Sequence, residues 1–576
     1  MNIGIVAFVG LELTSLRRQL ELTALILREK HTLVYRTTEY LQATDEHREA
    51  INRDFLGKVD VVLGPLEIDL FACRERVAKR IPYIVLLFGA TGRGLQPYAG
   101  CWQMLNTHDI LVGSCTRDME VVARFFSNAI SRNVPFPYDE AQFYPVAPAR
   151  QAQVRAGLGI AEDQKVILYA GRITVEKNFH TIVKVFSVLR QEMPDLLLIV
   201  AGHTTEEPSA GMGVYPFDLG RALRRLEEKL NIPQGAIRYA GHQNTESLRE
   251  LYSIADICVN MTLNHDENLG LAQVEAMGCG TPVVGSDWGG LADAIHDGIT
   301  GHKATTVLTQ TGVRVNWLEA VATILYLLRN DQARLAMRQA CRPYVQQTFS
   351  VRQYREHLEA LLADVQTFGD DPGEPLALTR FAQEFWDVCG GKGKLHSHPY
   401  CRGEHSFELY RQLIECYCGT PPASIAAGCV LMAHEIVCLA TPGRMNSQGN
   451  LEIDDPIYPL ILCVPEAIRT GVELVLGTFD SVATTSVEQL LNGPLRAHRD
   501  GPEVLSWMID AGLLLHVAPE QLKTKLPAIS PQINAPFFSV QRLDPRADLA
   551  VIDMGQPFNV DMSSASRIFE VATAMA

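Results

Sequence analysis

The sequence contains no long uninterrupted run of hydrophobic residues. A helix that spans a membrane needs roughly eighteen or more apolar residues in succession, and the chain of 576 residues has no such run. One apolar stretch, residues 423–440, carries His434 and Glu435 in its middle. Because ionisable side chains are costly in a lipid core, we expect no transmembrane segment and interpret residues 423–440 as a buried core helix.

The first residues do not have the pattern of a secretory signal. The first residues, MNIGIVAFVG, have no basic region and no cleavage site, and their pattern predicts a first β-strand. The chain contains 13 cysteines, and long chains without a secretory signal usually keep their thiols reduced. We therefore expect a cytoplasmic protein with free cysteines.

The chain has no excess of positive charge. Its 51 Lys and Arg residues are outnumbered by 66 Asp and Glu residues, which gives a formal net charge of -15. This balance argues against a nucleic-acid surface and against strong attraction to anionic membranes, while it leaves a local basic patch open. With 47% hydrophobic and 20% charged residues, the composition is that of an ordinary globular protein, and 576 residues are enough for about three domains.

The densest motif is the stretch NHDENLGLAQVEAMGCGTPVVGSDWGG at residues 264–290. Seven residues separate Glu267 from Glu275, and the pattern between them predicts a short turn and then a helix. The unpaired N–H groups and the dipole at the start of that helix can hold a diphosphate or a sugar oxygen. Glu267 can accept hydrogen bonds from sugar hydroxyls, and Glu275 can reach a ribose diol. The backbone groups of the turn and helix start belong to Asn268, Leu269, Gly270 and Leu271.

The residues after this helix indicate a parallel α/β unit. Gly278 and Gly280 end the helix, Pro-Val-Val at 282–284 predicts a buried strand, and Gly289 and Gly290 predict a tight turn. Ligands of such units bind at the carboxyl ends of the strands. The motif is therefore expected to lie at a ligand site.

This stretch resembles the signature of family 4 (group 1) of the retaining glycosyltransferases. In that signature, two glutamates separated by seven residues are followed by Ala-Met-x-x-Gly-x-Pro-Val-Val and a Gly-Gly turn. An ordinary buried helix and strand with two solvated glutamates is the alternative, and the joint agreement of the Gly, Pro and Val positions favours the resemblance. The resemblance implies a bacterial enzyme of the hexosyltransferase type that uses a nucleotide-diphosphate sugar as donor.

Strand and helix patterns alternate along residues 1–368, the part of the chain that the resemblance covers. The resemblance implies the α/β GT-B fold, in which two Rossmann-like doubly wound lobes face a cleft. We assign residues 1–148 to an amino-terminal lobe on the acceptor side and residues 149–368 to the donor lobe, whose last helix, at 349–368, crosses back onto the first lobe. The predicted strands of the donor lobe are residues 166–170, 196–201, 237–240 and 255–259, with a helix at 181–192.

Two cations lie in the predicted loop after the first strand of the donor lobe, GRITVEKNFH. Arg172 can clamp two oxygens, and Lys177 supplies a point charge. Alone, this loop would be interpreted as a solvated charged turn, but the resemblance implies that Arg172 and Lys177 bind the donor diphosphate. Because these cations and the backbone amides already neutralise the diphosphate, we expect no metal or other cofactor to be required.

The first lobe is less informative. Gly10 matches a glycine that the family places near the donor phosphates, although the usual Gly-Gly pair is here Gly10-Leu11. Many relatives have His-Gly after a strand of this lobe, where this chain has Phe88-Gly89. Glu12 and His108 are candidate substitutes for the missing acid–base histidine. A retaining transfer can also proceed without one, because the leaving oxygen can take the acceptor proton.

Residues 369–375, GDDPGEP, predict a linker, and residues 376–576 exceed what the two lobes require. We expect a mostly helical or α+β accessory domain of unknown role. Residues 485–515 resemble a winged-helix module, for which the acidic balance favours a protein or peptide contact. A zinc site and ordinary loop histidines with buried thiols both stay open, since Cys-x-x-Cys is absent. The soft side chains in question are His396, His398, Cys401, His405, Cys416 and Cys418.

The sequence therefore predicts a retaining glycosyltransferase with a nucleotide sugar as donor. The acceptor, whether glycan, lipid, small molecule or peptide, is open, as are the donor base and sugar and the oligomeric state, a homo-oligomer included. Two alternatives are an epimerase or phosphorylase on the same fold and an inactive scaffold that binds a partner through its last domain. Release of a nucleoside diphosphate in step with glycosylated product would distinguish a transferase from both.

Overall fold

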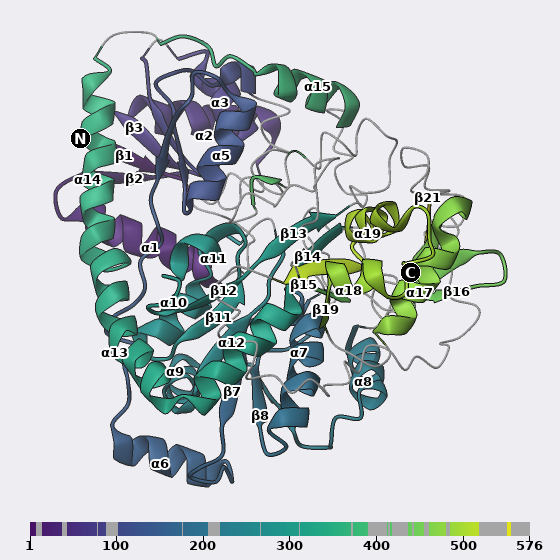
Figure 1. Cartoon of the computed structure of the whole chain (residues 1–576). Coiled ribbons are helices and arrows are strands. Elements are labelled where there is room, and N and C mark those ends of the chain that lie inside the picture. The colour runs from purple at the N-terminus through teal and green to yellow at the C-terminus, as the bar shows by residue number, and fades with distance from the viewer. Residues whose placement is uncertain are drawn as a thin grey trace. The chain divides into compact units, whose positions relative to one another are not determined.

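The computed structural model (Figure 1) describes residues 1–6, 14–36, 43–77, 79–87, 102–174, 177–204, 219–264, 267–309, 312–369, 373–389, 412, 415–417, 436–439, 443–453, 460–479, 484–517 and 550–553. The chain divides into two compact units, each with one six-stranded sheet. The first unit comprises Met1–Glu140, His265–Leu271 and Val345–Ser397. The second comprises Ala141–Asn264, Ala272–Tyr344 and His398–Ala576.

Six parallel strands form the sheet of the first unit. They are Asn2–Ile5 (β1), Thr32–Tyr35 (β2), Val61–Gly64 (β3), Tyr83–Leu86 (β4), Ile110–Gly113 (β5) and Ile130–Asn133 (β6). Their order in the sheet is β2-β1-β3-β4-β5-β6. The strands β3, β4 and β5 are buried along their whole length, which agrees with their apolar sequences, because helices cover both faces of a parallel sheet.

The last long helix of this unit, α14 (Val351–Thr367), packs on its first helix, α1 (Thr14–Arg28). The hydroxyls of Thr23 and Tyr354 lie 2.8 Å apart, and both side chains are buried. The helix predicted at 349–368 thus contacts the first helix of the chain, within the first unit. The other helices of the unit are Asp45–Gly57 (α2), Ile68–Arg74 (α3), Thr116–Phe125 (α5) and Arg380–Cys389 (α15).

The chain beyond α14 stays with the first unit. Leu378 forms an antiparallel bridge with Phe126. Phe385 on α15 meets the ring of Phe125 edge to face, with the ring centroids 5.3 Å apart. The boundary predicted at residue 376 therefore falls inside this unit, while a separate role for the residues that follow stays a prediction.

Six parallel strands also form the sheet of the second unit. They are Val166–Ala170 (β7), Leu197–Ala201 (β8), Ile237–Gly241 (β9), Ile257–Asn260 (β10), Val283–Ser286 (β11) and Gly301–Ala304 (β12). Their order is β12-β11-β10-β7-β8-β9. Read from β9, this is the Rossmann order 3-2-1-4-5-6. The strands predicted from the sequence agree with β7 to β10 to within two residues at each end.

Two helices, α7 (Phe179–Glu192) and α12 (Trp317–Arg329), pack side by side against this sheet in one continuous hydrophobic core. Gly289 and Gly290, which were expected to form a tight turn, instead begin a short helix, α11 (Gly289–Ala294). The remaining elements are Pro148–Gly157 (α6), Leu219–Lys229 (α8), Thr245–Ile254 (α9), Leu271–Gly278 (α10), Asp331–Thr348 (α13), Thr306–Thr309 (β13) and Gly312–Val315 (β14).

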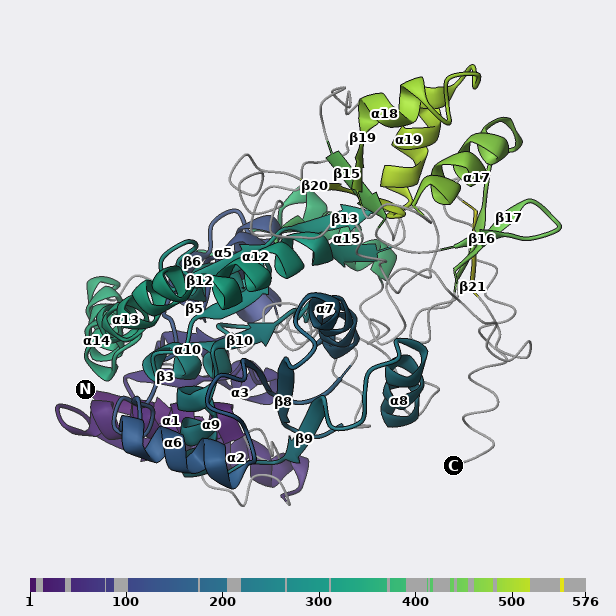
Figure 2. The ribbon, with the colours of Figure 1, turned by 60° about the horizontal axis from the view of Figure 1, so that its bottom comes forward.

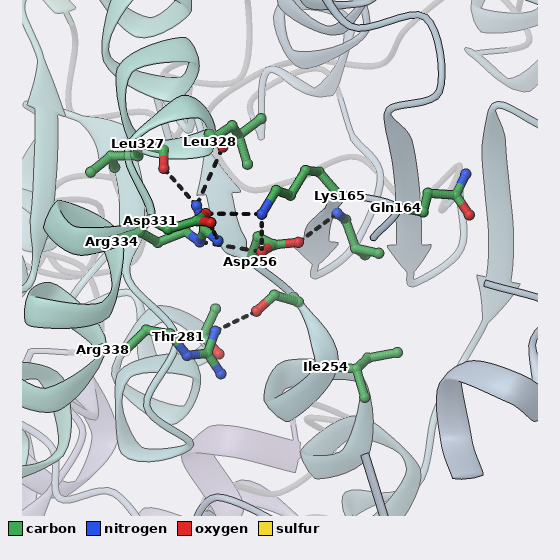
Figure 3. Close-up of polar contacts among 12 residues, drawn as sticks. Gln164, Lys165, Ile254, Asp256, Thr281, Leu327, Leu328, Asp331, Arg334 and Arg338 are labelled. Carbon is green, nitrogen blue, oxygen red and sulfur yellow. Dashed lines mark hydrogen bonds and ion pairs between the residues drawn. The ribbon is translucent and has the colours of Figure 1, made fainter. Parts of the chain in front are cut away.

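A partly buried polar network holds the amino ends of β7 and β10 (Figure 3). Asp256 accepts a hydrogen bond from the backbone N–H of Val166 at 2.8 Å and pairs with Arg334 at 3.2 Å. Asp331 lies 3.0 Å from Lys165 and also pairs with Arg334. Because ligands of parallel sheets bind at the opposite, carboxyl edge, we assign this network a supporting role in the sheet.

The described residues after 412 form two small sheets and three helices within the second unit (Figures 1 and 2). One sheet has the antiparallel order β19-β15-β20, and it lies beside the β13–β14 hairpin in both views. The other has the order β16-β17-β18-β21. The elements are Ile436–Leu439 (β15), Arg444–Met445 (β16), Asn450–Ile453 (β17), Leu460–Cys463 (β18), Arg469–Thr478 (α17), Thr484–Ser486 (β19), Val487–Asn492 (α18), Gly501–Asp510 (α19), Leu514–Val517 (β20) and Ala550–Asp553 (β21).

The strand β15 corrects the prediction of a buried core helix at 423–440. Its residues 436–439 pair with β19 and β20, while 423–435 and 440 lie outside the described residues. Val437 and Leu439 pack in the core of the carboxyl-terminal region, whereas Cys438 packs in the core of the second six-stranded sheet. A strand buried on both faces has no polar face, so its hydrophobic run cannot be told from a buried helix by periodicity.

The fold is α/β with two Rossmann-like lobes, the predicted GT-B class, extended by a carboxyl-terminal region with small sheets. The α+β alternative for that region is confirmed for its described part. Within the described residues, no helix is both long enough and apolar enough to cross a membrane.

Candidate active site

The strand order marks one place in the second unit as the expected ligand site. The strands β7 and β10 are neighbours in the sheet. The strands β8 and β9 continue the sheet on the side of β7, and β11 and β12 continue it on the side of β10, so the strand order reverses between β7 and β10. In open α/β sheets, ligands bind outside the carboxyl ends of the strands at such a point. The residues to consider are therefore those that directly follow β7 and β10.

Arg172 lies in the loop that follows β7. Its backbone carbonyl accepts a hydrogen bond of 2.6 Å from the hydroxyl of Tyr169, a fully buried residue of β7. The side chain of Arg172 is half-buried and makes no hydrogen bond or ion pair with another described residue. The backbone is thus fixed at the carboxyl edge while the guanidinium group is available to bind an anion.

The start of this loop extends the pairing of β7 with β8. The backbone N–H groups of Gly171 and Ile173 donate to the carbonyls of Ala201 and His203 at 3.0 and 2.9 Å. A Cβ atom at Gly202 would lie 1.8 Å from the carbonyl oxygen of Gly171. Only glycine permits this close approach of two backbones, which determines the path of the chain into Arg172.

Asn178 joins the two loops at the carboxyl edge. It adopts the left-handed conformation (φ 55°, ψ 32°) directly before α7, which asparagine tolerates better than most residues. Its Nδ2 donates to the carbonyl of Met261, after β10, at 2.9 Å, and its Oδ1 accepts from the hydroxyl of Thr181 at 2.6 Å. The half-buried Lys177 precedes it, so Arg172 and Lys177 belong to one loop that is held to the end of β10.

Glu267 and the turn after it belong to the first unit, whereas Arg172, Lys177 and Glu275 belong to the second. Glu267 is half-buried, and Gly270 has a positive φ of 74° directly before α10 begins at Leu271. Leu269 in this turn is buried, and Asn268 is half-buried. The predicted turn and helix start are therefore confirmed, and their role in donor binding stays a prediction.

Glu275 lies in the last turn of α10 and is only 9% exposed. Burial, together with the charge of Glu275, holds the pKa of the Tyr252 phenol well above its ordinary value. Burial also raises the pKa of the Cys279 thiol to about 12, with a smaller contribution from Glu275. The carboxylate of Glu275 thus lies beside two neutral groups in the interior.

Of the first-lobe candidates, Gly10, Glu12, Phe88 and Gly89 lie outside the described residues. His108 is described, and its position argues against an acid–base role. It precedes β5, at the amino edge of the sheet, and its ring stacks on Phe368 with the centroids 4.4 Å apart. Because ligands bind at the carboxyl edge, we assign His108 a packing role.

The cluster proposed as a zinc site falls largely outside the described residues, which include none of His396, His398, Cys401, His405 and Cys418. Cys416 is described and buried, and its thiol donates to the carbonyl of Gln412 at 3.8 Å. Within the described ranges, no group of three or more His, Cys, Asp or Glu side chains could hold a metal ion. The zinc hypothesis is therefore untested.

Two residues that support these loops were not predicted. The sequence did contain a signal for Asn178. It is an asparagine between a charged loop and a predicted helix, and asparagine adopts the left-handed backbone more readily than most residues. Trp288, which lies beside the Gly-Gly pair, donates its indole N–H to the carbonyl of Asn264 at 2.9 Å. Nothing in the sequence indicates this contact, because it joins the ends of two strands through tertiary packing.

A family model matches the second lobe. Residues 150–344 match the model of the Glycosyl transferases group 1. The range contains β7 to β12, the loop of Arg172 and Lys177, and both motif glutamates.

Curated relatives and solved structures give more distant likenesses. The D-inositol 3-phosphate glycosyltransferases of Mycobacterium tuberculosis and Mycobacterium bovis are 32% identical over 216 residues, which is 38% of this chain and 40% of theirs. The sucrose-phosphate synthase of Thermosynechococcus elongatus is 17% identical over 64% of this chain and 99% of its own, with a TM-score of 0.49. HepE of Anabaena, in complex with UDP-glucose, is 14% identical over 63% of this chain and 99% of its own, with a TM-score of 0.48. The chain thus spans less than half the length of the curated relatives.

Proposed function

We propose that this protein is a retaining glycosyltransferase that transfers a sugar, of the hexose class, from a nucleotide-diphosphate donor. One observation carries the proposal. The Arg172 loop is fixed at the carboxyl end of β7, at the reversal of strand order, and its guanidinium group has no partner among the described residues. A cation held at this edge of a Rossmann-like lobe suits a diphosphate.

In this proposal, Arg172 clamps two diphosphate oxygens, and Lys177 supplies a second positive charge. The amides of residues 268–271 complete the anion site at the start of α10. Glu267 accepts hydrogen bonds from the sugar, Glu275 binds the ribose, and Gly10 lets the backbone of the first lobe approach the phosphates. No metal ion is required, because these groups neutralise the charge that develops on the leaving diphosphate.

The transfer would proceed on one face of the sugar. The acceptor oxygen forms a bond to the anomeric carbon while the bond from that carbon to the diphosphate oxygen breaks. The acceptor proton passes to the departing diphosphate oxygen, so the reaction needs no separate base. The enzyme contributes by positioning both substrates and by stabilising the leaving group.

The test begins with a binding screen of nucleotide sugars against the full chain, followed by mass spectrometry of products with candidate acceptors. D-inositol 3-phosphate is one reasonable acceptor to include, given the name of the mycobacterial relatives. We expect a nucleoside diphosphate to be released in step with glycosylated product. Isomerised donor would instead indicate an epimerase, phosphate dependence a phosphorylase, and absence of turnover a scaffold.

Variants at the site sharpen this test. Glu267→Ala should lower turnover by about two orders of magnitude, since it removes a contact to the transition state. Arg172→Lys should lose the bidentate clamp and bind the donor more weakly. The matched control is Arg225→Lys on the exposed side of α8, which should leave donor binding unchanged. Wild-type behaviour of both site variants would refute the assignment.

A further inference from the structure

Trp288 holds the chain that leads into the motif glutamate. It follows β11, is fully buried, and donates its indole N–H to the carbonyl of Asn264 at 2.9 Å. Asn264 is three residues before Glu267 in the sequence. We call residues 261–264 and 267–270 the donor loop, because they connect β10 to α10 and carry the proposed sugar and diphosphate contacts.

The first half of the donor loop is fixed from both neighbouring strands. Asn178, after β7, donates to the carbonyl of Met261 at 2.9 Å, and Ser286, at the end of β11, donates to the carbonyl of Thr262 at 2.6 Å. The contact from Trp288 to Asn264 is the last of this series before the motif begins. A change at Trp288 therefore acts on the donor loop at the residue closest to the proposed contacts.

A residue of the carboxyl-terminal region covers Trp288. Tyr417 stacks on the indole with the ring centroids 5.6 Å apart and an interplanar angle of 25°. The carbonyl of Tyr417 accepts a hydrogen bond from the N–H of Gly289 at 2.8 Å, and its side chain is 1% exposed. The indole is thus shielded from water, which strengthens its hydrogen bond.

We propose that Trp288 and Tyr417 are positioning residues for the donor loop, so that the carboxyl-terminal region controls the affinity for the nucleotide-sugar donor. The inference rests on the proposed function for the identity of the ligand. The coupling itself rests only on the contacts from Tyr417 to Trp288 and from Trp288 to Asn264. The extra region, on this reading, is an integral support of the donor site.

The first measurement is hydrogen–deuterium exchange of the full chain over peptides that cover residues 261–271. Trp288→Phe removes the indole N–H and leaves the carbonyl of Asn264 without its donor. Tyr417→Leu removes the stacked ring. We expect each variant to raise the exchange of these peptides about tenfold, the change that corresponds to the loss of one hydrogen bond of roughly 1.4 kcal/mol. Tyr417→Phe keeps the ring and should restore the wild-type rate.

Trp317→Phe is the matched control. Trp317 also donates its indole N–H to a carbonyl of the carboxyl-terminal region, that of Leu439 at 3.1 Å, and it is also buried. It begins α12, and its hydrogen bond does not lead to the donor loop. Its loss should loosen residues near 439 and leave the exchange of residues 261–271 unchanged.

The second measurement is the affinity for UDP and for other nucleoside diphosphates. Trp288→Phe and Tyr417→Leu should weaken binding about tenfold, and Trp317→Phe should not. Unchanged exchange over residues 261–271 in Trp288→Phe, or an equal rise in Trp317→Phe, overturns the inference. If the wild-type chain binds no nucleoside diphosphate, the proposed function fails, while the exchange measurement still decides the coupling.

Discussion

Replacing Asn178 by alanine should separate the two loops at the carboxyl edge of the second sheet. The side chain makes two hydrogen bonds, to the carbonyl of Met261 and from the hydroxyl of Thr181. Its backbone is left-handed. Alanine can make neither hydrogen bond, and its Cβ atom is unfavourable in this conformation.

The size of the effect follows from these contacts. Leaving the buried carbonyl of Met261 without a donor costs about 1–3 kcal/mol, and a non-glycine residue without a local side-chain hydrogen bond in the left-handed region costs about 1 kcal/mol. Together they give a destabilisation of about 2–4 kcal/mol. Because the second unit exceeds 250 residues, each kcal/mol lowers Tm by only about 1–2 °C, so Asn178→Ala should lower Tm by roughly 2–8 °C.

The assay is thermal unfolding monitored by circular dichroism, with nucleoside diphosphate affinity measured in parallel. The informative comparison is Asn178→Gly, which loses the same hydrogen bonds but has no Cβ atom. It should be about 1 kcal/mol more stable than the alanine variant, and both should bind the nucleotide more weakly. If Asn178→Ala melts like the wild type, or if Asn178→Gly melts lower than Asn178→Ala, the reasoning is wrong.

Three further changes test other parts of the structure. Gly202→Ala should lower Tm and abolish nucleotide binding, because its Cβ atom would lie 1.8 Å from a carbonyl oxygen, whereas Gly57→Ala, with nothing within 4 Å, should be tolerated in the same melts. Asp256→Asn should cost about 2–3 kcal/mol in denaturant unfolding, because it leaves the buried Arg334 without a full counter-charge. Burial raises the pKa of Asp510 to about 6, so the folded state holds a proton that the unfolded state loses, and stability falls as pH rises from about 4 to 6. Asp510→Asn should therefore raise the free energy of unfolding at pH 8 by an amount on the order of 1 kcal/mol after solvent screening, and with it Tm, and should leave Tm unchanged at pH 4.

The sequence predicted much of the second sheet, because strands such as β7 and β8 are short apolar runs followed by glycine. The strands β7 to β10 and the helix α7 were predicted to within two residues at each end. Since a parallel sheet places its ligand loops at one edge, the position of Arg172 and Lys177 followed from the strand pattern alone.

The supporting contacts could not be predicted in the same way. The hydrogen bonds from Asn178 to Met261 and from Trp288 to Asn264 join residues far apart in the sequence. They depend on the order of strands in the sheet, which a local pattern does not contain. His108 was a candidate because of its chemistry, and its position at the amino edge of β5 became evident only from the register of the first sheet.

The strand β15 was wrongly predicted as part of a helix, because its pairing with β19 and β20 also depends on residues far apart in the sequence. This strand bears on how the carboxyl-terminal region should be tested. Because Cys438 and Leu515 pack in the core of the second sheet, this region is part of the lobe that would bind the donor. Trp317 also loses its acceptor, the carbonyl of Leu439, if the region is removed. A chain that ends near Gly369 would expose this apolar surface and the indole of Trp288 to water. We therefore expect such a chain to be insoluble or to melt well below the full chain, as sedimentation and thermal unfolding would show; a soluble monomer with the Tm of the full chain would contradict this view of the region.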